Sequence, residues 1–311
     1  MVLDLSHIEN LAITGANGFV GRSIVEKIAT FPTEYLPMKL TLVTRGGVNY
    51  SIEQRLSKRT KLYSQDLCLP WNLPGEFSHL INLAADGTRD PYSDNACSQF
   101  EVISENLVRW IERSNTRVKV FHASSGACFD YRPINTGSNQ INSKKSFIQN
   151  RIKVEESLSK YAERLDFSLT IGRLFTFSGK NILKNSKYAL SDFILSAVKN
   201  GLISVNGNPL TQRSYLHQDS MSEWILRATT AMPDFILQIG SNEAVTILQL
   251  AEYISQKTGA EVEFSKEPSG GDIYIPDNTD TRIKLGVKEG KNWKEAVLEM
   301  IAEARKINNV G

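Results

Sequence analysis

Residues 10–28 read NLAITGANGFVGRSIVEKI, and this stretch decides the fold. It opens with a short apolar run at 11–13, which is typical of a strand buried on both faces in a parallel sheet. Three glycines follow with the spacing G-x-x-G-x-x-G, at Gly15, Gly18 and Gly21. Apolar residues then recur with helical spacing up to residue 28. The stretch therefore predicts a strand, a glycine-rich turn and a helix.

Each glycine has its own expected role in this turn. Gly15 permits a tight turn out of the strand, and Gly18 lets backbone amides approach a pyrophosphate. Gly21 lets the helix pack close to the sheet. The N-terminus of the helix would bind the anion through its free N–H groups and its dipole. A second apolar strand at 39–44 favours a dinucleotide site over an ordinary glycine-rich turn.

The composition is that of an ordinary globular protein. The chain has 311 residues, of which 41% are hydrophobic and 23% charged, with a net charge of +2. This near balance of charge does not favour nucleic acid or an anionic membrane as a partner. No apolar run reaches about 18 residues, which a membrane span would need, and no secretory signal stands at the start, so we expect a cytoplasmic protein. The three cysteines lack a C-x-x-C pair and predict reduced thiols without a metal site.

The rest of the first half alternates predicted strands and helices. Further strands are expected at 61–63, 79–84 and 118–123, with an amphipathic helix at 100–111. Short connections without hairpin signals predict an α/β fold with a doubly wound parallel sheet. Beyond about residue 170 the chain becomes rich in loops, and helical spacing returns only at 246.

Residues 14–21, TGANGFVG, resemble the T-G-x-x-G-x-x-G opening of the extended short-chain dehydrogenases/reductases, a family of NAD(P)-dependent nucleotide-sugar epimerases, dehydratases and reductases. The resemblance covers nearly the whole chain and implies a Rossmann-type sheet with a smaller α+β C-terminal substrate lobe. It places the dinucleotide-binding Rossmann domain at 1–175, with 211–242 returning to the sheet. The substrate-binding lobe is expected at 176–210 and 243–311. A homodimer is expected by analogy with other members.

The resemblance also implies a set of cofactor-binding positions. In addition to the three glycines, they are Asn17, Phe19, Val20, Thr44, Arg45, Asp66, Leu67, Leu83, Ala84 and Ala85. At the end of the second strand an acidic residue would accept from the ribose 2′-OH of NAD, whereas an arginine accommodates the 2′-phosphate of NADP. Arg45 stands there and no acid does, so we favour NADP over NAD. The alternative is a solvated loop arginine.

The family carries out hydride chemistry on a sugar with a serine or threonine and a Tyr-x-x-x-Lys pair. The residues SSGACF at 124–129 resemble the family's S-S-x-x-V-Y, which assigns the role of the catalytic hydroxyl to Ser125. In the pair, the tyrosine acts as a proton shuttle, and the nearby lysine lowers the pKa of the phenol electrostatically. No Tyr-x-x-x-Lys follows in this chain.

Two registers fit the helix that should carry the pair. In the first, FIQNRIKVE at 147–155 matches Y-x-x-S-K-x-x-x-E, so that Phe147 replaces the tyrosine and Arg151 the lysine. In the second, Gln149 and Lys153 take these positions, and the match at the final acid is lost. We prefer the first register, and neither register leaves a phenol at the tyrosine position.

Other residues are expected near the sugar nucleotide. By resemblance these are Asp86, Thr176 and Arg213. The planar fork of Arg213 would pair with a diphosphate, and the alternative is a structural arginine that bonds loop carbonyls. With Phe147 in place, the proton would come from another group, such as Tyr131, or from a water positioned by Arg151.

The sequence therefore predicts an NAD(P)-dependent oxidoreductase of the epimerase/dehydratase type, with an altered active site, that acts on a nucleotide-activated sugar. A rival hypothesis is a catalytically weak dinucleotide-binding protein with a structural or sensing role. A third is a partner subunit that supports an active homologue. Turnover of nucleotide sugars separates the first hypothesis from the other two.

Overall fold

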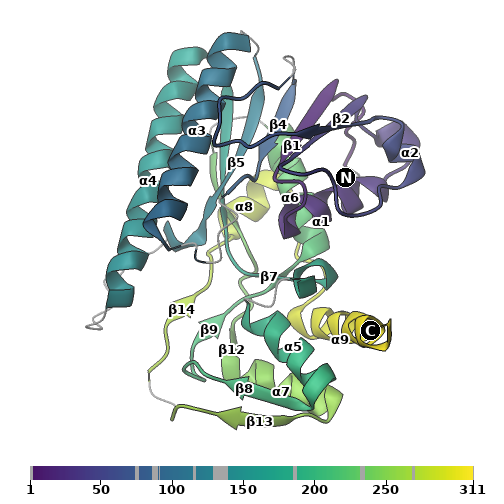
Figure 1. The fold of residues 1–311 in the computed structure, drawn as a ribbon, viewed down its shortest axis with the longest axis vertical. Coiled ribbons are helices and arrows are strands. Elements are labelled where there is room, and N and C mark those ends of the chain that lie inside the picture. The colour runs from purple at the N-terminus through teal and green to yellow at the C-terminus, as the bar shows by residue number, and fades with distance from the viewer. Residues whose placement is uncertain are drawn as a thin grey trace. The chain divides into compact units, whose positions relative to one another are not determined.

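The chain forms two compact units, and Figure 1 shows their elements. The first unit contains Met1–Leu174 and Glu223–Leu237, and the second contains Phe175–Ser222 and Gln238–Gly311. The structure is a computed structural model. It describes residues 3–73, 77–85, 90, 92–114, 117–128, 139–184, 188–231, 235–267 and 270–310, without the side chains of 139–143 and 309–310.

The first unit is built on a seven-stranded sheet with the order β11-β6-β5-β4-β1-β2-β3. The strands are β1 (Asn10–Thr14), β2 (Lys39–Thr44), β3 (Thr60–Ser64), β4 (His79–Asn82), β5 (Lys119–Ser125), β6 (Ser168–Leu174) and β11 (Phe235–Ile239). Neighbours among β1 to β6 pair in parallel. The strand order reverses direction between β1 and β4, which confirms the predicted doubly wound sheet.

Helices cover this sheet. They are α1 (Phe19–Ala29), α2 (Gln54–Ser57), α3 (Asp94–Ser114), α4 (Asn139–Leu165) and the later part of α6 (Gln218–Thr230), with short 3-10 turns η1 (Thr33–Tyr35) and η2 (Gly126–Cys128). Helices α3 and α4 lie side by side in Figure 1. Phe100 and Leu107 of α3 and Leu158 of α4 share one apolar core with Val120 of β5 and Leu169 of β6. Burial of these apolar faces holds both helices against the sheet.

The second unit is smaller and mixes helices with short strand pairs. Its helices are α5 (Ala189–Asn200), α7 (Ile247–Thr258), α8 (Thr279–Leu285), α9 (Trp293–Val310) and the 3-10 turn η3 (Lys180–Lys184). Its strands are β7 (Phe177–Ser178), β8 (Leu202–Val205), β9 (Gln212–Arg213), β10 (Leu216–His217), β12 (Val245–Thr246), β13 (Glu261–Phe264) and β14 (Ile273–Tyr274). They form three small sheets, β10-β7, β12-β9-β14 and β13-β8. This is the α+β character expected of the C-terminal lobe.

The segment that returns to the first unit is shorter than the one proposed from the sequence. The returning segment is Glu223–Leu237, inside the 211–242 proposed from the sequence. The residues before it belong to the second unit because β9 pairs there with β12 and β14. Those partners lie some 30 and 60 residues further along the chain, so local sequence patterns do not reveal them.

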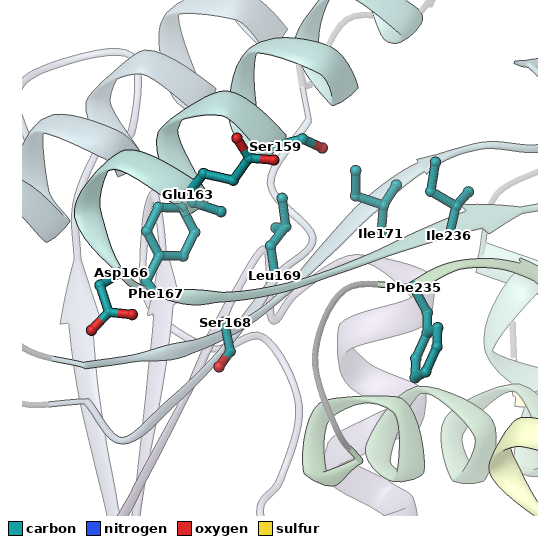
Figure 2. Close-up of a pocket in the computed structure, with 10 residues that line it drawn as sticks. Ser159, Glu163, Asp166, Phe167, Ser168, Leu169, Ile171, Phe235 and Ile236 are labelled. Atoms are coloured by element: carbon teal, nitrogen blue, oxygen red, sulfur yellow. The ribbon is translucent and has the colours of Figure 1, made fainter.

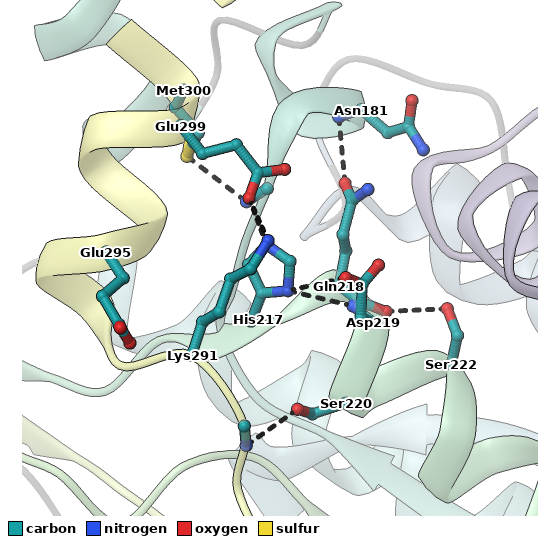
Figure 3. A network of polar contacts seen from close by, with 12 residues as sticks. Asn181, His217, Gln218, Asp219, Ser220, Ser222, Lys291, Glu295, Glu299 and Met300 are labelled. Carbon is teal, nitrogen blue, oxygen red and sulfur yellow. Dashed lines mark hydrogen bonds and ion pairs between the residues drawn. The ribbon is translucent and has the colours of Figure 1, made fainter. Parts of the chain in front are cut away.

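Figure 3 shows a polar network that ties α9 to the start of α6 within the second unit. The buried ring of His217 accepts from the Asp219 N–H at Nδ1, 3.3 Å away, and its Nε2 lies 3.3 Å from Glu299 Oε2 on α9. Glu299 also pairs with Lys291 at 2.5 Å. Burial lowers the pKa of His217 although both carboxylates oppose this effect. His217 therefore serves as a structural link between elements.

No helix in the described ranges is long and apolar enough to cross a membrane.

We expect Gly21→Ala to destabilise the protein. A Cβ at Gly21 would lie 2.6 Å from the Gly15 carbonyl oxygen and 2.8 Å from the Ala16 Cα, and this backbone cannot move aside as a flexible side chain could. Overpacking of this kind costs about 1–3 kcal/mol, which exceeds the gain of about 0.5–1 kcal/mol from alanine in a helix. Equilibrium urea unfolding should show the loss. The control Gly46→Ala, where a Cβ meets nothing within 4 Å, should leave stability near that of the wild type.

Candidate active site

The glycine-rich turn between β1 and α1 has one exposed glycine and two that the protein's own backbone requires. Gly15 has a left-handed φ of +67°, and a Cβ there would come 3.0 Å from the Leu83 carbonyl oxygen. Gly21 packs against the turn itself. Gly18, by contrast, has φ −68° and is exposed, and a Cβ on it would meet only the Gly15 carbonyl oxygen, 3.2 Å away. The absence of a side chain at Gly18 thus leaves the backbone accessible to solvent.

Helix α1 begins directly at this exposed glycine. Gly18 is its N-cap and supplies no side-chain cap, and the first turn carries no acidic residue. The N-terminal N–H groups and the positive end of the helix dipole therefore point towards an anion that approaches over Gly18. These residues fit the pyrophosphate of a dinucleotide, as the sequence predicts.

Asn17 and Tyr50 join the glycine-rich turn to the loop that follows β2. Asn17 Nδ2 donates to the Gly47 carbonyl at 2.6 Å, and its Oδ1 accepts from the Asn49 N–H at 3.1 Å. The Tyr50 hydroxyl donates to the Ala16 carbonyl at 3.1 Å. Hydrogen bonds within the protein therefore hold the glycine-rich turn and the loop after β2 together.

Arg45 lies in this loop and is exposed. Its carbonyl accepts from Ser64 Oγ at 2.9 Å, which fixes the backbone at the end of β2. Its guanidinium makes no hydrogen bond or ion pair with any residue that the structure describes. Thr44, the preceding residue, is buried at the end of β2. The exposed fork of Arg45 is therefore open to a ligand phosphate, and its role remains a prediction.

The ends of β1 and β4 meet through Thr14. Its hydroxyl donates to Asn82 Oδ1 at 2.7 Å and accepts from the N–H groups of Leu83 and Ala84, at 3.1 and 3.3 Å. Leu83 and Ala84 consequently pass directly over Gly15, while Ala85 is exposed. The small residues predicted here are explained by this close approach of two backbones.

Side-chain hydrogen bonds hold the segment that follows β3. Leu67 is buried, and its carbonyl accepts from Trp71 Nε1 and Asn106 Nδ2, each at 3.1 Å. Asp66 is exposed, and one of its carboxylate oxygens accepts from the Cys68 N–H at 3.0 Å. The predicted adenine-contacting position therefore lies on an ordered turn.

The two serines at the end of β5 have different surroundings. Ser124 is buried and donates to Glu155 Oε1 at 2.5 Å, and Glu155 pairs with Arg173 on β6 at 2.6 Å. Ser125 is half-buried and accepts from the Ala127 N–H at 3.2 Å. Its hydroxyl proton is donated to no residue in the described part of the chain. Ser124 is thus committed to structure, whereas Ser125 keeps a donor for a ligand, as its predicted role requires.

Helix α4 presents Phe147, Arg151 and Glu155 on one buried face. Their exposed fractions are 8%, 6% and 4%, and the spacing i, i+4, i+8 places them in a row. Gln149 and Lys153, the residues of the alternative register, are exposed, and Lys153 pairs with Glu101 on α3 at 3.1 Å. The first register therefore directs its residues inward, and the second directs them to solvent.

Arg151 contacts two aromatic rings. Its Cζ lies 3.4 Å from the centroid of the Phe100 ring and 4.6 Å from that of Phe147. One guanidinium nitrogen donates to Asn150 Oδ1 at 3.1 Å. A planar, weakly hydrated guanidinium stacks on such rings more readily than an ammonium does. Phe147 also contacts the Tyr92 ring edge-on, at 5.2 Å between centroids.

A buried histidine near Arg151 was not predicted from the sequence. His122 on β5 is 1% exposed, and its Nδ1 lies 3.0 Å from Asn82 Nδ2. Burial, followed by the charge of Arg151, lowers the pKa of His122 to about 3. The available signal was a histidine inside the apolar strand VKVFHA. The hydrogen bonds from Thr14 through Asn82 to His122 cross three strands just below the candidate site.

The predicted substrate-binding residues of the second unit already have partners within the protein. Arg213 Nη2 lies 3.0 and 3.3 Å from the two carboxylate oxygens of Asp272, and its Cζ lies 5.7 Å from the Tyr274 ring centroid. Thr176 donates to the Ser214 carbonyl. A diphosphate would have to share the Arg213 fork with Asp272, a partner that the sequence did not indicate. The predicted residues Asp86 and Tyr131 lie outside the described residues.

Figure 2 shows a cavity beside the C-terminal end of α4, lined by residues such as Glu163, Phe167, Leu169 and Ile236. None of the predicted site residues lines it. It includes Ser168, where β6 begins, and so lies towards the amino ends of the strands. Ligands of open α/β sheets bind at the carboxyl ends, so this cavity is not the candidate site. The described residues also include no group of three or more His, Cys, Asp or Glu side chains that could hold a metal ion.

A family model agrees with this geometry. The model of the NAD dependent epimerase/dehydratase family matches residues 11–240, from β1 through β11. The chain belongs to this family. No curated protein sequence matches the chain.

Solved structures of the family share the fold of this member. The UDP-glucose 4-epimerase of Thermotoga maritima, solved with UDP-glucose, is 17% identical with a TM-score of 0.75, over 97% of this chain and 100% of that one. The UDP-glucuronic acid 4-epimerase of Bacillus cereus, in complex with UDP-glucuronic acid and NAD, is 14% identical with a TM-score of 0.76, over 96% and 99%. The Bordetella bronchiseptica enzyme WbmF, in complex with NAD+, is 16% identical with a TM-score of 0.76, over 99% and 95%.

The buried His122 predicts a loss of stability in acid. Its pKa is about 3 in the folded protein and about 6.5 in an unfolded chain, so the unfolded state binds more protons between these values. Stability therefore falls as the pH drops, by about 2 kcal/mol between pH 7 and pH 5 from this group. Urea unfolding of His122→Phe should show a smaller acid loss than the wild type by this amount. Between pH 7 and pH 8 the free energies of unfolding of the two proteins should change in parallel. An equal loss of stability in acid for both proteins would contradict the low pKa of His122.

Proposed function

We propose that the protein is an NAD(P)-dependent oxidoreductase of the epimerase/dehydratase type that acts on a nucleotide-activated sugar. The observation that carries the proposal is the exposed Gly18 at the N-terminus of α1, because the protein's own packing leaves backbone open at the point where a pyrophosphate would bind. The similar structures of the family were solved with UDP-sugars or NAD, which supports the same ligand classes here. A homodimer and a cytoplasmic location belong to the same proposal.

In this mechanism the first unit supplies binding and orientation. The glycine-rich turn holds the pyrophosphate, and Arg45 pairs with a 2′-phosphate, which favours NADP. The bound nicotinamide supplies hydride acceptance and donation. Ser125 donates its free hydroxyl proton to the reacting sugar oxygen. Phe147 has no proton to transfer, so the site is altered at the position where the family has a tyrosine.

The same alteration favours a second candidate function. Because Phe147 is apolar and Arg151 is packed against two aromatic rings, a protein that binds the dinucleotide and a nucleotide sugar with little turnover is also compatible with these contacts. Incubation with NAD+ or NADP+ and a panel of nucleotide sugars decides between the two. Formation of a reduced nicotinamide or of an altered sugar supports the enzyme, and binding without either supports the second function.

Gly18→Val should abolish or weaken dinucleotide binding while the protein remains folded. Its φ and ψ are open to any residue, but the branched side chain would occupy the space over the α1 N-terminus. We expect calorimetry to show a loss of at least about tenfold in affinity, equivalent to about 1.4 kcal/mol. The matched control is Gly207→Val in the second unit, where a Cβ meets nothing within 4 Å. Unchanged affinity in a folded Gly18→Val protein would show that the site lies elsewhere.

Arg45→Ala should change the choice between the two cofactors. A charge-assisted hydrogen bond to a phosphate contributes about 1.5–3 kcal/mol, so the variant should bind NADPH about tenfold to a hundredfold more weakly. Binding of NADH, which has no 2′-phosphate, should change little. The same titrations on Arg55→Ala, an exposed arginine that bonds Glu53 and the Ala29 carbonyl, provide the control. A wild type that prefers NADH, or equal losses for both cofactors, would contradict the proposal.

A further inference from the structure

We propose that Tyr92 supplies the proton-transferring phenol that Phe147 cannot supply. The inference rests on the proposed function, because it concerns the sugar hydroxyl that would react there. Tyr92 lies just before α3, and its ring contacts the Phe147 ring edge-on, with centroids 5.2 Å apart and planes at 71°. The structure thereby brings a hydroxyl-bearing ring against the side chain that has lost one.

The topology puts this pair at the carboxyl edge of the sheet. Glu155 of α4 bonds Ser124 at the end of β5, and α4 then runs back towards the start of β6. Phe147 lies eight residues before Glu155, so it is about 12 Å nearer the N-terminus of α4. This places it beyond that edge of the sheet. Tyr92 lies in the connection from β4 to α3, which leaves the same edge. The two rings therefore meet on the side of the sheet where Ser125 ends β5.

The two rings differ in accessibility in the way that proton transfer needs. Phe147 is 8% exposed, whereas Tyr92, whose ring contacts it, is 39% exposed. A ligand that reaches this edge can therefore contact the phenol of Tyr92 more readily than the ring of Phe147. Proton transfer requires a group within hydrogen-bond reach of the substrate oxygen, and tyrosine is among the residues that perform it.

The backbone around Tyr92 is held by a small hydrogen-bonded turn. Asp90 Oδ1 accepts from the Tyr92 N–H at 3.0 Å, and the Asp90 carbonyl accepts from Ser93 Oγ at 2.9 Å. Ser93 Oγ in turn accepts from the Ala96 N–H at the start of α3, at 3.2 Å. A ring on such a turn starts from a defined position, which lowers the entropy lost when it engages a substrate.

A positively charged side chain also lies next to this pair of rings. The Arg151 guanidinium lies 4.6 Å from the centroid of the Phe147 ring, and the Tyr92 ring contacts that same ring. Arg151 is thus a buried cation in contact with the ring that Tyr92 touches, whereas the Asp90 carboxylate accepts from the Tyr92 N–H. Arg151 occupies the position where the family resemblance places a lysine, one helical turn from Phe147.

The proposed step balances in atoms and electrons. The sugar hydroxyl loses its proton to the Tyr92 oxygen as the C–O bond becomes a carbonyl. The C–H bond of the same carbon breaks, and its hydride is taken up by an oxidised nicotinamide dinucleotide, the required co-reactant. Ser125 donates a hydrogen bond to the same sugar oxygen. In the reverse direction Tyr92 returns the proton.

Tyr92→Phe tests the step because it removes the hydroxyl and keeps the ring packing. With NAD+ and UDP-glucose as probes, hydride transfer should fall by about 10²–10⁴-fold. The matched control is Tyr161→Phe on α4, whose ring stacks under Arg164, and it should retain wild-type transfer. The double variant Tyr92→Phe with Phe147→Tyr should recover part of the loss, because it returns a phenol to the neighbouring ring. Wild-type transfer in Tyr92→Phe, or a loss confined to Tyr131→Phe, would overturn the proposal.

A second readout does not depend on turnover. In protein labelled with ¹³C at the tyrosine ζ carbon, the resonance missing from Tyr92→Phe identifies Tyr92, and UDP-glucose with NAD+ should shift it while that of Tyr161 stays in place. An unshifted Tyr92 resonance overturns the assignment even if the enzyme is active. A shifted resonance in a protein that transfers no hydride supports Tyr92 as the sugar contact and contradicts the proposed oxidoreductase function.

Discussion

The arrangement of the candidate site depends on one buried carboxylate. Glu155 of α4 accepts from Ser124 at the end of β5 and pairs with Arg173 on β6. Because the three side chains come from three elements, the contact fixes how far α4 is displaced along the sheet. Removing one partner of a buried pair costs about 3–5 kcal/mol, since it leaves a charge uncompensated. Phe147 and Arg151 take their positions from this anchor.

The surroundings of Arg151 explain why an arginine is suited to this position. The guanidinium contacts the rings of Phe100 and Phe147, and it donates to Asn150. An ammonium in its place would lose hydration that these apolar rings cannot replace. Phe147 and Arg151 are therefore parts of one aromatic cluster, in which the rings pack against the guanidinium.

Each unit carries a different part of the proposed chemistry. The first unit holds the glycine-rich turn, Arg45 and Ser125, all at the carboxyl ends of parallel strands. The second unit holds Arg213, whose fork is already paired with Asp272. A cation that is paired before a ligand arrives is held in a defined orientation, but a diphosphate must compete with the carboxylate for its donors. Binding at the second unit is therefore expected to depend on both members of this pair.

Sequence spacing by itself determined the features that depend on neighbours along the chain. The glycines around Gly18 follow from local backbone geometry, and the inward row on α4 follows from helical periodicity. Each of these contacts joins residues within about one or two turns, so the order of residue types is enough to predict it.

Only the tertiary structure decided the contacts between residues far apart in the sequence. Asn82 meets His122, Arg213 meets Asp272, and Tyr92 meets Phe147 because strands and helices separated by 40 to 60 residues pack side by side. It also decided that the adjacent residues Ser124 and Ser125 have different partners. Successive residues of a strand point to opposite faces of the sheet, so their side chains meet different elements. The partner of a polar side chain is set by which element packs above it, and no local pattern in the sequence encodes that choice.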